Sequence, residues 1–224
     1  MVYEIVKLRS KHRIFIETLI LTFLILIIGL FLGFYIEYNR TKNIIEDYKS
    51  FEIEALNLRL QNYYYQTIEL ADCDRAIQEN LRFADEIYEK GLKIQKYEDV
   101  NELTEDLLLE KKKYVLLKTE LWLNSILLKQ KCKNPFNTIS YIYTQNENFA
   151  KEAEQSAISN VLGEIKKDKG NDVILLPIAG DLDLSSVNLF LRVYNITYLP
   201  SIVINEEIVL EGFHGKEKIV QYLK

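Results

Sequence analysis

The most continuous feature of the hydropathy pattern is an uncharged apolar run at residues 18–36, TLILTFLILIIGLFLGFYI. A helix of about 19 residues spans roughly 28 Å, close to the ~30 Å hydrocarbon core of a bilayer. A cleavable signal peptide would have a shorter apolar stretch ending in small residues, whereas Glu37 and Tyr38 follow this run. The pattern therefore predicts an uncleaved transmembrane helix at 18–36 in contact with membrane lipid. Residues 1–17 form a separate N-terminal segment before it.

A helical pattern follows in residues 37–133. Apolar residues recur at alternating spacings of three and four, which predicts helices with one buried face, a coiled coil being one form. The phase changes at residues 71–74, where two aspartates favour a break or kink. Three consecutive tyrosines, 63–65, cannot all share one face, so part of this aromatic surface is expected to be exposed. The two stripes are Ile53, Leu56, Leu60, Tyr63, Thr67 and Leu70, and then Ile77, Leu81, Ala84, Tyr88 and Gly91.

A further helix is expected from about residue 100 to residue 131. Asp99 and Glu102 have capping-box spacing before an apolar run, and Asn134-Pro135 ends the helix because a residue before proline disfavours helical geometry. A seven-residue repeat predicts a bundle core, with a partner-binding groove as the alternative. We therefore expect a helical stalk or hairpin at 37–133, which could also form a homo-oligomer. The repeat comprises Leu107, Tyr114, Leu121 and Leu128, with Leu117 and Trp122 beside it.

From residue 136 onward short apolar runs alternate with helical segments, which argues for an α/β arrangement closed by a hairpin. Glu206 and Glu207 are expected to form the hairpin turn. The predicted order is strand 139–143, helix 148–167, strand 173–177, helix 185–194, strand 201–204, strand 208–213 and helix 215–224.

Residues 135–224 resemble the thioredoxin-like superfamily. The segment 197–205, TYLPSIVIN, resembles the family's cis-proline loop and the strand after it, and Leu210-Glu211-Gly212-Phe213 resembles the next strand. Residues 180–183, GDLD, are also similar to members of the superfamily. The resemblance implies a thioredoxin fold with a peptide groove beside the loop; alternatively, the proline serves only a tight turn. The loop residues are Tyr198, Leu199, Pro200 and Ser201.

The active-site motif of the family is missing. The resemblance places a Cys-x-x-Cys pair between the first strand and first helix, where residues 143–152 read YTQNENFAKE. Thiol–disulfide exchange requires an attacking thiolate, so this domain is expected to lack the family's chemistry and to need no cofactor. Asn146 and Asn148 are predicted helix N-caps. The degenerate positions are Asn146, Asn148, Phe149 and Glu152.

The charges that flank the apolar run predict its orientation. Four basic residues, at 7, 9, 11 and 13, precede the run closely, and three, at 40, 42 and 49, follow it. The positive-inside rule therefore favours an N-terminus in the cytoplasm and an extracytoplasmic C-terminal domain.

Cys73 and Cys132 are the two cysteines of the chain. Outside the cytoplasm, such a pair is expected to be oxidised. A hairpin turn at 97–101 brings them to the same end, but one arm is then about eight residues, or ~12 Å, too long, whereas a disulfide needs Cα atoms about 4.4–6.8 Å apart. A later turn or an unwound last helical turn would close this gap. Two free thiols and a redox-active pair are the alternatives.

Composition excludes several functions. The net charge of −5 and pI near 5.3 provide no basic surface for nucleic acid. Two cysteines and two histidines are too few for a multi-cysteine zinc site. Asn39 and Asn195 fit the glycosylation pattern, although Asn195 is also expected to end a helix in left-handed geometry.

These patterns predict a membrane-anchored, redox-inactive thioredoxin-like protein that is not an enzyme and acts as a binding or scaffold module for an extracytoplasmic protein or peptide. An accessory thiol–disulfide oxidoreductase using Cys73 and Cys132 is one alternative hypothesis. A structural coiled-coil spacer or oligomerisation protein is the other.

Overall fold

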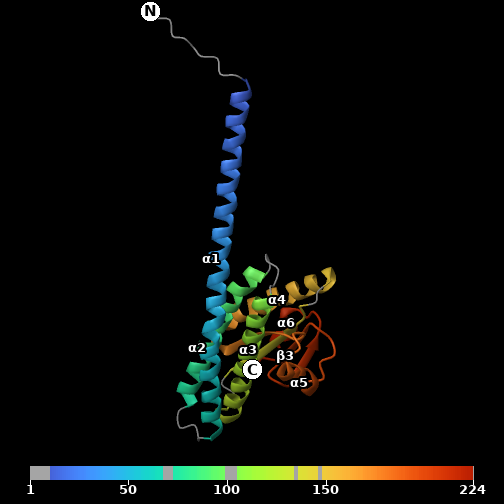
Figure 1. Ribbon diagram of the computed structural model, residues 1–224. Coiled ribbons are helices and arrows are strands. Elements are labelled where there is room, and N and C mark those ends of the chain that lie inside the picture. Colours follow the sequence, from blue (N-terminus) through green and yellow to red (C-terminus); the bar gives the residue numbers. More distant parts are fainter. Residues whose placement is uncertain (1–10, 68–72, 99–104, 134–135, 146–147, 224) are drawn as a thin grey trace, which may run out of the picture. The chain divides into compact units, whose positions relative to one another are not determined.

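The computed structural model describes residues 11–67, 73–98, 105–133, 136–145 and 148–223. The chain divides into two units, residues 1–46 and 47–224. The described residues are mostly helical, with one four-stranded mixed sheet in the second unit (Figure 1).

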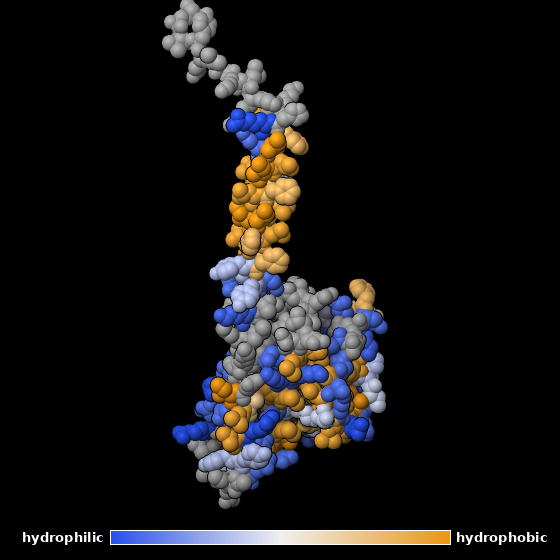
Figure 2. All heavy atoms as spheres, in the orientation of Figure 1, coloured by the Kyte–Doolittle hydropathy of each residue, from blue (hydrophilic) through white to orange (hydrophobic). Residues whose placement is uncertain are grey.

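The first unit contains the N-terminal part of helix α1 (Lys11–Thr67). The segment Arg13–Asn39 is long and apolar enough to cross a membrane, by length and composition. Its large apolar side chains are exposed and form a continuous hydrophobic band (Figure 2). The hydroxyls of Thr18 and Thr22 donate to the carbonyls of Ile14 and Thr18, each at 2.9 Å, which satisfies these polar groups within the helix.

Three helical segments pack together in the second unit: the C-terminal part of α1, α2 (Cys73–Glu98) and α3 (Glu105–Lys131). Asn80 Nδ2 donates to Ser125 Oγ at 3.0 Å between α2 and α3, and Asn124 Nδ2 donates to the Leu58 carbonyl at 3.1 Å between α3 and α1. The residues of the predicted repeat on α3 are buried wherever their side chains are described. The buried members of the repeat are Tyr114, Leu117, Leu121, Trp122 and Leu128.

The predicted stripe on α1 is not buried within the single chain, as far as its side chains are described. Ile53, Leu56, Leu60 and Tyr63 are 59–77% exposed. The buried apolar residues of this segment are Leu58 and Tyr65, on the other side of the helix. Polar contacts account for the choice of face, since the buried side carries Glu54, whose Oε1 accepts from Lys90 Nζ at 2.9 Å, and Asn62, which donates to Asn124 Oδ1.

The remaining members of the predicted stripes differ in how far they are buried. The side chain of Thr67 and the whole of Leu70 lie outside the described residues. In the second stripe Ala84 is buried and the other members are half-buried. Of the three tyrosines, Tyr65 is buried and the other two are exposed, as expected. The predicted break at 71–74 and the capping box at 99–102 lie largely outside the described residues.

The sheet has the strand order β2-β1-β3-β4. Strand β1 (Asn137–Tyr143) runs parallel to β2 (Val173–Ala179) and antiparallel to β3 (Ser201–Ile204), and β4 (Ile208–Glu211) pairs with β3. The element order of the C-terminal segment agrees with the sequence prediction to within a few residues at each boundary. The helical elements are α4 (Phe149–Lys169), the 3₁₀ turn η1 (Gly170–Asp172), α5 (Ser185–Val193) and α6 (Lys216–Val220).

Alternation along the strands divides the packing between the two sheet faces. One face forms the core with α4 and α6, and includes Ile139 and Val173 from the strands and Ile158 from α4. Helices α3 and α5 pack together through Trp122, whose ring stacks on Phe190 at 4.6 Å between ring centroids. The helical segments therefore pack directly against the sheet domain within the second unit.

Candidate functional site

The structure places Cys73 and Cys132 at disulfide-bonding distance, with sulfur atoms 2.02 Å apart and Cα atoms 5.7 Å apart. Helices α2 and α3 have 26 and 27 residues, so the two arms of the hairpin match in length. Their connection falls between Glu98 and Glu105, which is later than the turn predicted at 97–101. With the connection at this later position, the length mismatch that the sequence suggested disappears.

The connection between β1 and α4 holds the degenerate active-site positions. Asn148 caps α4, because its Oδ1 accepts from the Lys151 amide at 3.0 Å, as predicted. Phe149 is 87% exposed and Glu152 is also exposed. Asn146 lies outside the described residues. The described part of this connection brings no thiol to the start of α4.

The loop before β3 contains a cis peptide bond between Leu199 and Pro200. Lys151 Nζ donates to the Leu199 carbonyl at 2.7 Å and lies 4.8 Å from the centroid of the Tyr198 ring. The Tyr198 hydroxyl donates to Glu154 Oε2 at 2.9 Å. The loop is thus tied to the first turns of α4, and a main-chain acceptor beside the proline already has an internal partner.

Two further features complete this loop. Ser201 is buried, and its hydroxyl donates to the Tyr198 carbonyl at 2.6 Å. Asn195 has a φ of 51°, the left-handed geometry expected where a helix ends. Binding of a peptide beside Tyr198, Leu199, Pro200 and Ser201 stays a prediction.

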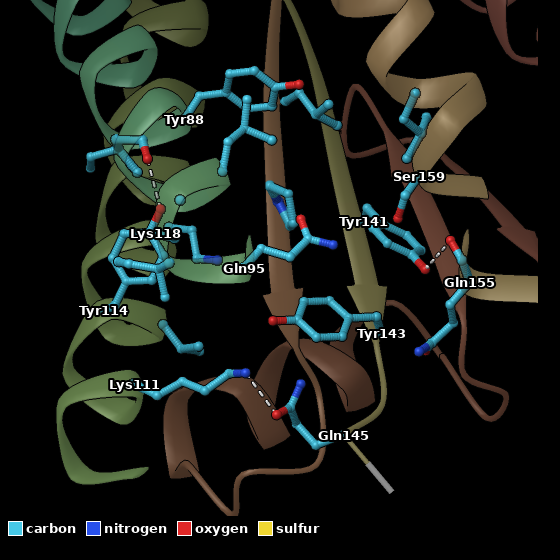
Figure 3. Close-up of a pocket in the computed structure, with 18 of the residues that line it drawn as sticks. Tyr88, Gln95, Lys111, Tyr114, Lys118, Tyr141, Tyr143, Gln145, Gln155 and Ser159 are labelled. Atoms are coloured by element: carbon cyan, nitrogen blue, oxygen red, sulfur yellow. Dashed lines mark hydrogen bonds between the residues drawn. The ribbon is translucent and has the colours of Figure 1, made fainter. Parts of the chain in front are cut away.

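A cavity of about 450 Å³ lies between the helical segments and the sheet domain (Figure 3). Helices α2 and α3 form one wall, and α4 with strands β1 and β2 forms the other. Its most distinctive lining side chains are four tyrosines and two lysines: Tyr88, Tyr114, Tyr141, Tyr143, Lys111 and Lys118.

The helical wall depends on a close approach between α2 and α3. A Cβ atom at Gly91 would overlap the Tyr114 hydroxyl. The glycine therefore lets this hydroxyl reach the Ile87 carbonyl, to which it donates at 2.7 Å. Lys118 Nζ lies 4.4 Å from the centroid of the Tyr114 ring, a cation–π distance.

The opposite wall is held by side chains that bond the end of β1. Gln155 of α4 accepts from the Thr144 amide at 2.7 Å and donates to the Thr144 carbonyl at 3.1 Å. Asp181 accepts from the Gln145 amide at 2.9 Å. Lys111 Nζ donates to Gln145 Oε1 at 2.7 Å, which joins the two walls at one end of the cavity (Figure 3).

The cavity is positively charged and aromatic. Lys111 and Lys118 are only 3% and 5% exposed, and Glu152 is the one carboxylate among the described lining residues. Burial, with a smaller contribution from Glu89, raises the pKa of Tyr88, so its phenol stays neutral at physiological pH. The described lining contains no cysteine or histidine. The arrangement is suited to binding an anion.

Sequence reasoning found the elements of this cavity but not the cavity itself. Tyr88, Gly91 and Tyr114 were assigned to helical stripes, which gave them a packing role only. A usable signal was present on α3, where Lys111 and Lys118 are seven residues apart and flank Tyr114. Lysines at this spacing beside a buried stripe indicate charges directed toward the interior. Among the described residues no cluster of three or more His, Cys, Asp and Glu side chains could hold a metal ion.

No family model matches the chain, and no curated protein sequence matches it.

Proposed function

We propose that this chain is a membrane-anchored, thioredoxin-like binding protein whose second unit holds a small organic anion in the cavity between α2, α3 and the sheet. The anchor is the apolar helix, with the N-terminus in the cytoplasm and the second unit outside. The thioredoxin-like assignment is supported by the strand order β2-β1-β3-β4 and by the cis Leu199–Pro200 bond before β3. Because residues 143–152 contain no cysteine, the protein has no thiol chemistry at the family's usual position.

The cavity is the observation that carries the binding function. Its volume of about 450 Å³ falls within the range of small-molecule sites, roughly 300–1,000 Å³. Burying two lysines costs free energy unless counter-charges or hydrogen bonds compensate for lost hydration. A ligand carboxylate, sulfonate or phosphate would form ion pairs with Lys111 and Lys118, and these would further offset the free-energy cost of burying the two charges.

The ligand's apolar part is expected to be flat or aromatic. Tyr141 and Tyr143 lie 5.8 Å apart between ring centroids on one wall, and Tyr88 and Tyr114 line the other. Aromatic walls favour ring stacking at such distances. Lys111 and Lys118 are both buried, and the lower effective dielectric around a buried charge strengthens each lysine–anion contact. A planar aromatic carboxylate therefore matches both the charge and the shape of the cavity.

Isothermal titration calorimetry on the full chain in detergent tests this proposal. Naphthalene-2-carboxylate serves as the probe, and the neutral naphthalene-2-carboxamide, of nearly the same shape, controls for binding through the ring alone. The carboxylate is expected to bind one per chain and at least about tenfold more tightly than the carboxamide, because about 1.4 kcal/mol of charge-assisted bonding corresponds to that factor.

Matched variants locate the binding. Lys118→Gln and Lys111→Gln are each expected to weaken carboxylate binding at least about fivefold, an effect of about 1 kcal/mol. Lys112→Gln, on the same helix but outside the cavity lining, is expected to leave binding unchanged. Equal affinities for carboxylate and carboxamide, or equal losses in all three variants, would refute the proposed site.

A further inference from the structure

Helix α1 presents an apolar stripe that is exposed in the described part of the second unit. Ile53, Leu56, Leu60 and Tyr63 are all exposed. At 3.6 residues per turn, they share one side of α1, and the buried Leu58 lies on the opposite side. The same helix therefore has two separate apolar faces, one buried and one exposed among the described residues.

The spacing of the exposed stripe is that of a coiled-coil seam. Ile53 and Leu60 fall at a positions, and Leu56 and Tyr63 fall at d positions, of a seven-residue repeat. A β-branched residue and a leucine at successive a and d positions favour pairs of parallel helices. Such a seam is completed by an identical stripe on a second helix in the same register.

A groove of about 430 Å³ runs along one flank of this stripe, between α1 and α3. Arg59 and Gln66 border it from α1, and these residues occupy the g positions of the repeat. Its apolar lining comes from Leu123, Ile126 and Leu127 of α3. In a parallel pair each g position faces an e position of the other helix. The groove is therefore located where an e residue of a second helix would project.

We propose that two copies of this chain associate in parallel through the α1 stripe at residues 53–67, with Tyr64 of each copy entering the α1–α3 groove of the other. Tyr64 occupies an e position and is exposed. Its ring would contact Leu123 and the guanidinium of Arg59, which also forms an ion pair with Glu120 at 3.0 Å. The aromatic ring thereby gains both apolar contact and a cation–π interaction.

A second copy suits this surface for two physical reasons. Two chains held by the same N-terminal membrane helix have the same orientation, as a parallel seam requires; this step rests on the proposed membrane anchor. Confinement to a bilayer also raises the effective concentration of the second helix, which offsets the small number of heptads. The charges do not oppose pairing, because Arg59 at g faces Tyr64 at e.

Cysteine crosslinking of the full chain in isolated membranes tests the contact. In a parallel pair, equivalent a positions face each other, so Leu60→Cys is expected to give a disulfide-linked product at twice the chain mass of 26.4 kDa on non-reducing gels. Leu189→Cys on α5 is the matched control, since the two leucines are 60% and 62% exposed. At least about tenfold more dimer from Leu60→Cys than from Leu189→Cys supports the proposal.

Three crosslinking outcomes would overturn the proposed dimer: equal crosslinking of the two variants, absence of the Leu60→Cys dimer, or a crosslink to a different protein.

Analytical ultracentrifugation of the full chain in detergent gives an independent measurement of the dimer. Leu60→Glu and Tyr64→Ala are expected to raise the dimer dissociation constant at least about tenfold, corresponding to about 1.4 kcal/mol, with Leu189→Glu unchanged. A monomeric parent chain at every concentration tested would also overturn the proposal, while cavity binding measured by calorimetry would be unaffected.

Discussion

Trp122 Nε1 on α3 donates a hydrogen bond of 2.8 Å to Glu206 Oε1 in the turn between β3 and β4. The other carboxylate oxygen of Glu206 accepts from Lys129 Nζ, also at 2.8 Å. Both lysine and carboxylate are largely buried. Glu206 therefore connects the helical part of the second unit to the hairpin of the sheet.

Replacing Glu206 by alanine is expected to lower the free energy of unfolding by about 3 kcal/mol, because it leaves Lys129 buried without its carboxylate partner. Trp122 is the only tryptophan, so its fluorescence during urea unfolding reports on this contact. Glu207→Ala is the matched control in the same turn, where the side chain is exposed, and a change within about 0.5 kcal/mol is expected there.

A double-mutant cycle distinguishes the ion pair from a general loss of packing. If Lys129 and Glu206 stabilise each other, Lys129→Met combined with Glu206→Ala will cost less than the sum of the single changes, since neither charge is then left alone. Strict additivity would show that the two side chains act independently and that the ion pair does not stabilise the fold.

The pairing of Cys73 with Cys132 predicts a large stability difference between oxidised and reduced protein. The cysteines are 59 residues apart, and closing a loop of that length is expected to stabilise the fold by about 4 kcal/mol in the loop-entropy model. Urea unfolding with and without reductant measures the difference, and the Cys73→Ser/Cys132→Ser double variant should match the reduced protein.

Resistance to reduction distinguishes a structural Cys73–Cys132 disulfide from a redox-active pair. A structural disulfide is expected to persist in mild glutathione buffers, as measured by thiol alkylation and mass spectrometry. Rapid exchange with a thiol substrate that disappears in Cys73→Ser would instead favour the oxidoreductase alternative.

The sheet domain was predictable because its signals are local. Apolar runs in 139–143 and 173–177 are bounded by turn residues, so short-range pattern suffices to identify strands. Asn148 is a second example, since an N-cap is determined by residues within one turn of it.

The face of α1 that packs inward was not predictable in this way. Both of its faces carry apolar residues, and the regular stripe through Leu60 is the stronger pattern, yet Leu58 and Tyr65 are the buried residues. The selection depends on partners distant in sequence, such as Asn124, which bonds the Leu58 carbonyl. The cavity was missed for the same reason, because its walls come from five elements whose arrangement no local pattern encodes.

A buried phenol, Tyr65, and a half-buried one, Tyr194, predict a loss of stability in alkaline solution. Burial raises the pKa of Tyr65 and Tyr194 above the ordinary 10.0, with smaller contributions from Glu79 and Glu206 respectively. A folded-state pKa above the unfolded one means that this stability is fully present below pH 10 and is lost as the pH rises through the folded-state pKa. The free energy of unfolding is therefore expected to fall above pH 10.

Tyr194→Phe isolates this effect, because phenylalanine retains the stacking ring without the titrating hydroxyl. Urea unfolding at pH 8 and at pH values above 10 should show a shallower decline in the variant than in the parent chain. An identical decline in both would mean that other groups cause the alkaline loss.

The close approach of Tyr114 to α2 predicts opposite effects of the same substitution at two glycines. Gly91→Ala introduces a methyl group that overlaps the Tyr114 hydroxyl, so it is expected to break the bond to the Ile87 carbonyl and destabilise the fold by about 1–3 kcal/mol. Gly163→Ala in α4 meets nothing within 4 Å and is expected to stabilise the helix by up to about 1 kcal/mol. Urea unfolding of both variants checks the sign of each change in the free energy of unfolding.

The same two variants also test the cavity. Because Tyr114 lines the cavity, Gly91→Ala should weaken naphthalene-2-carboxylate binding, whereas Gly163→Ala should not. Equal stabilisation of the fold by both alanines would refute the packing that forms the helical wall.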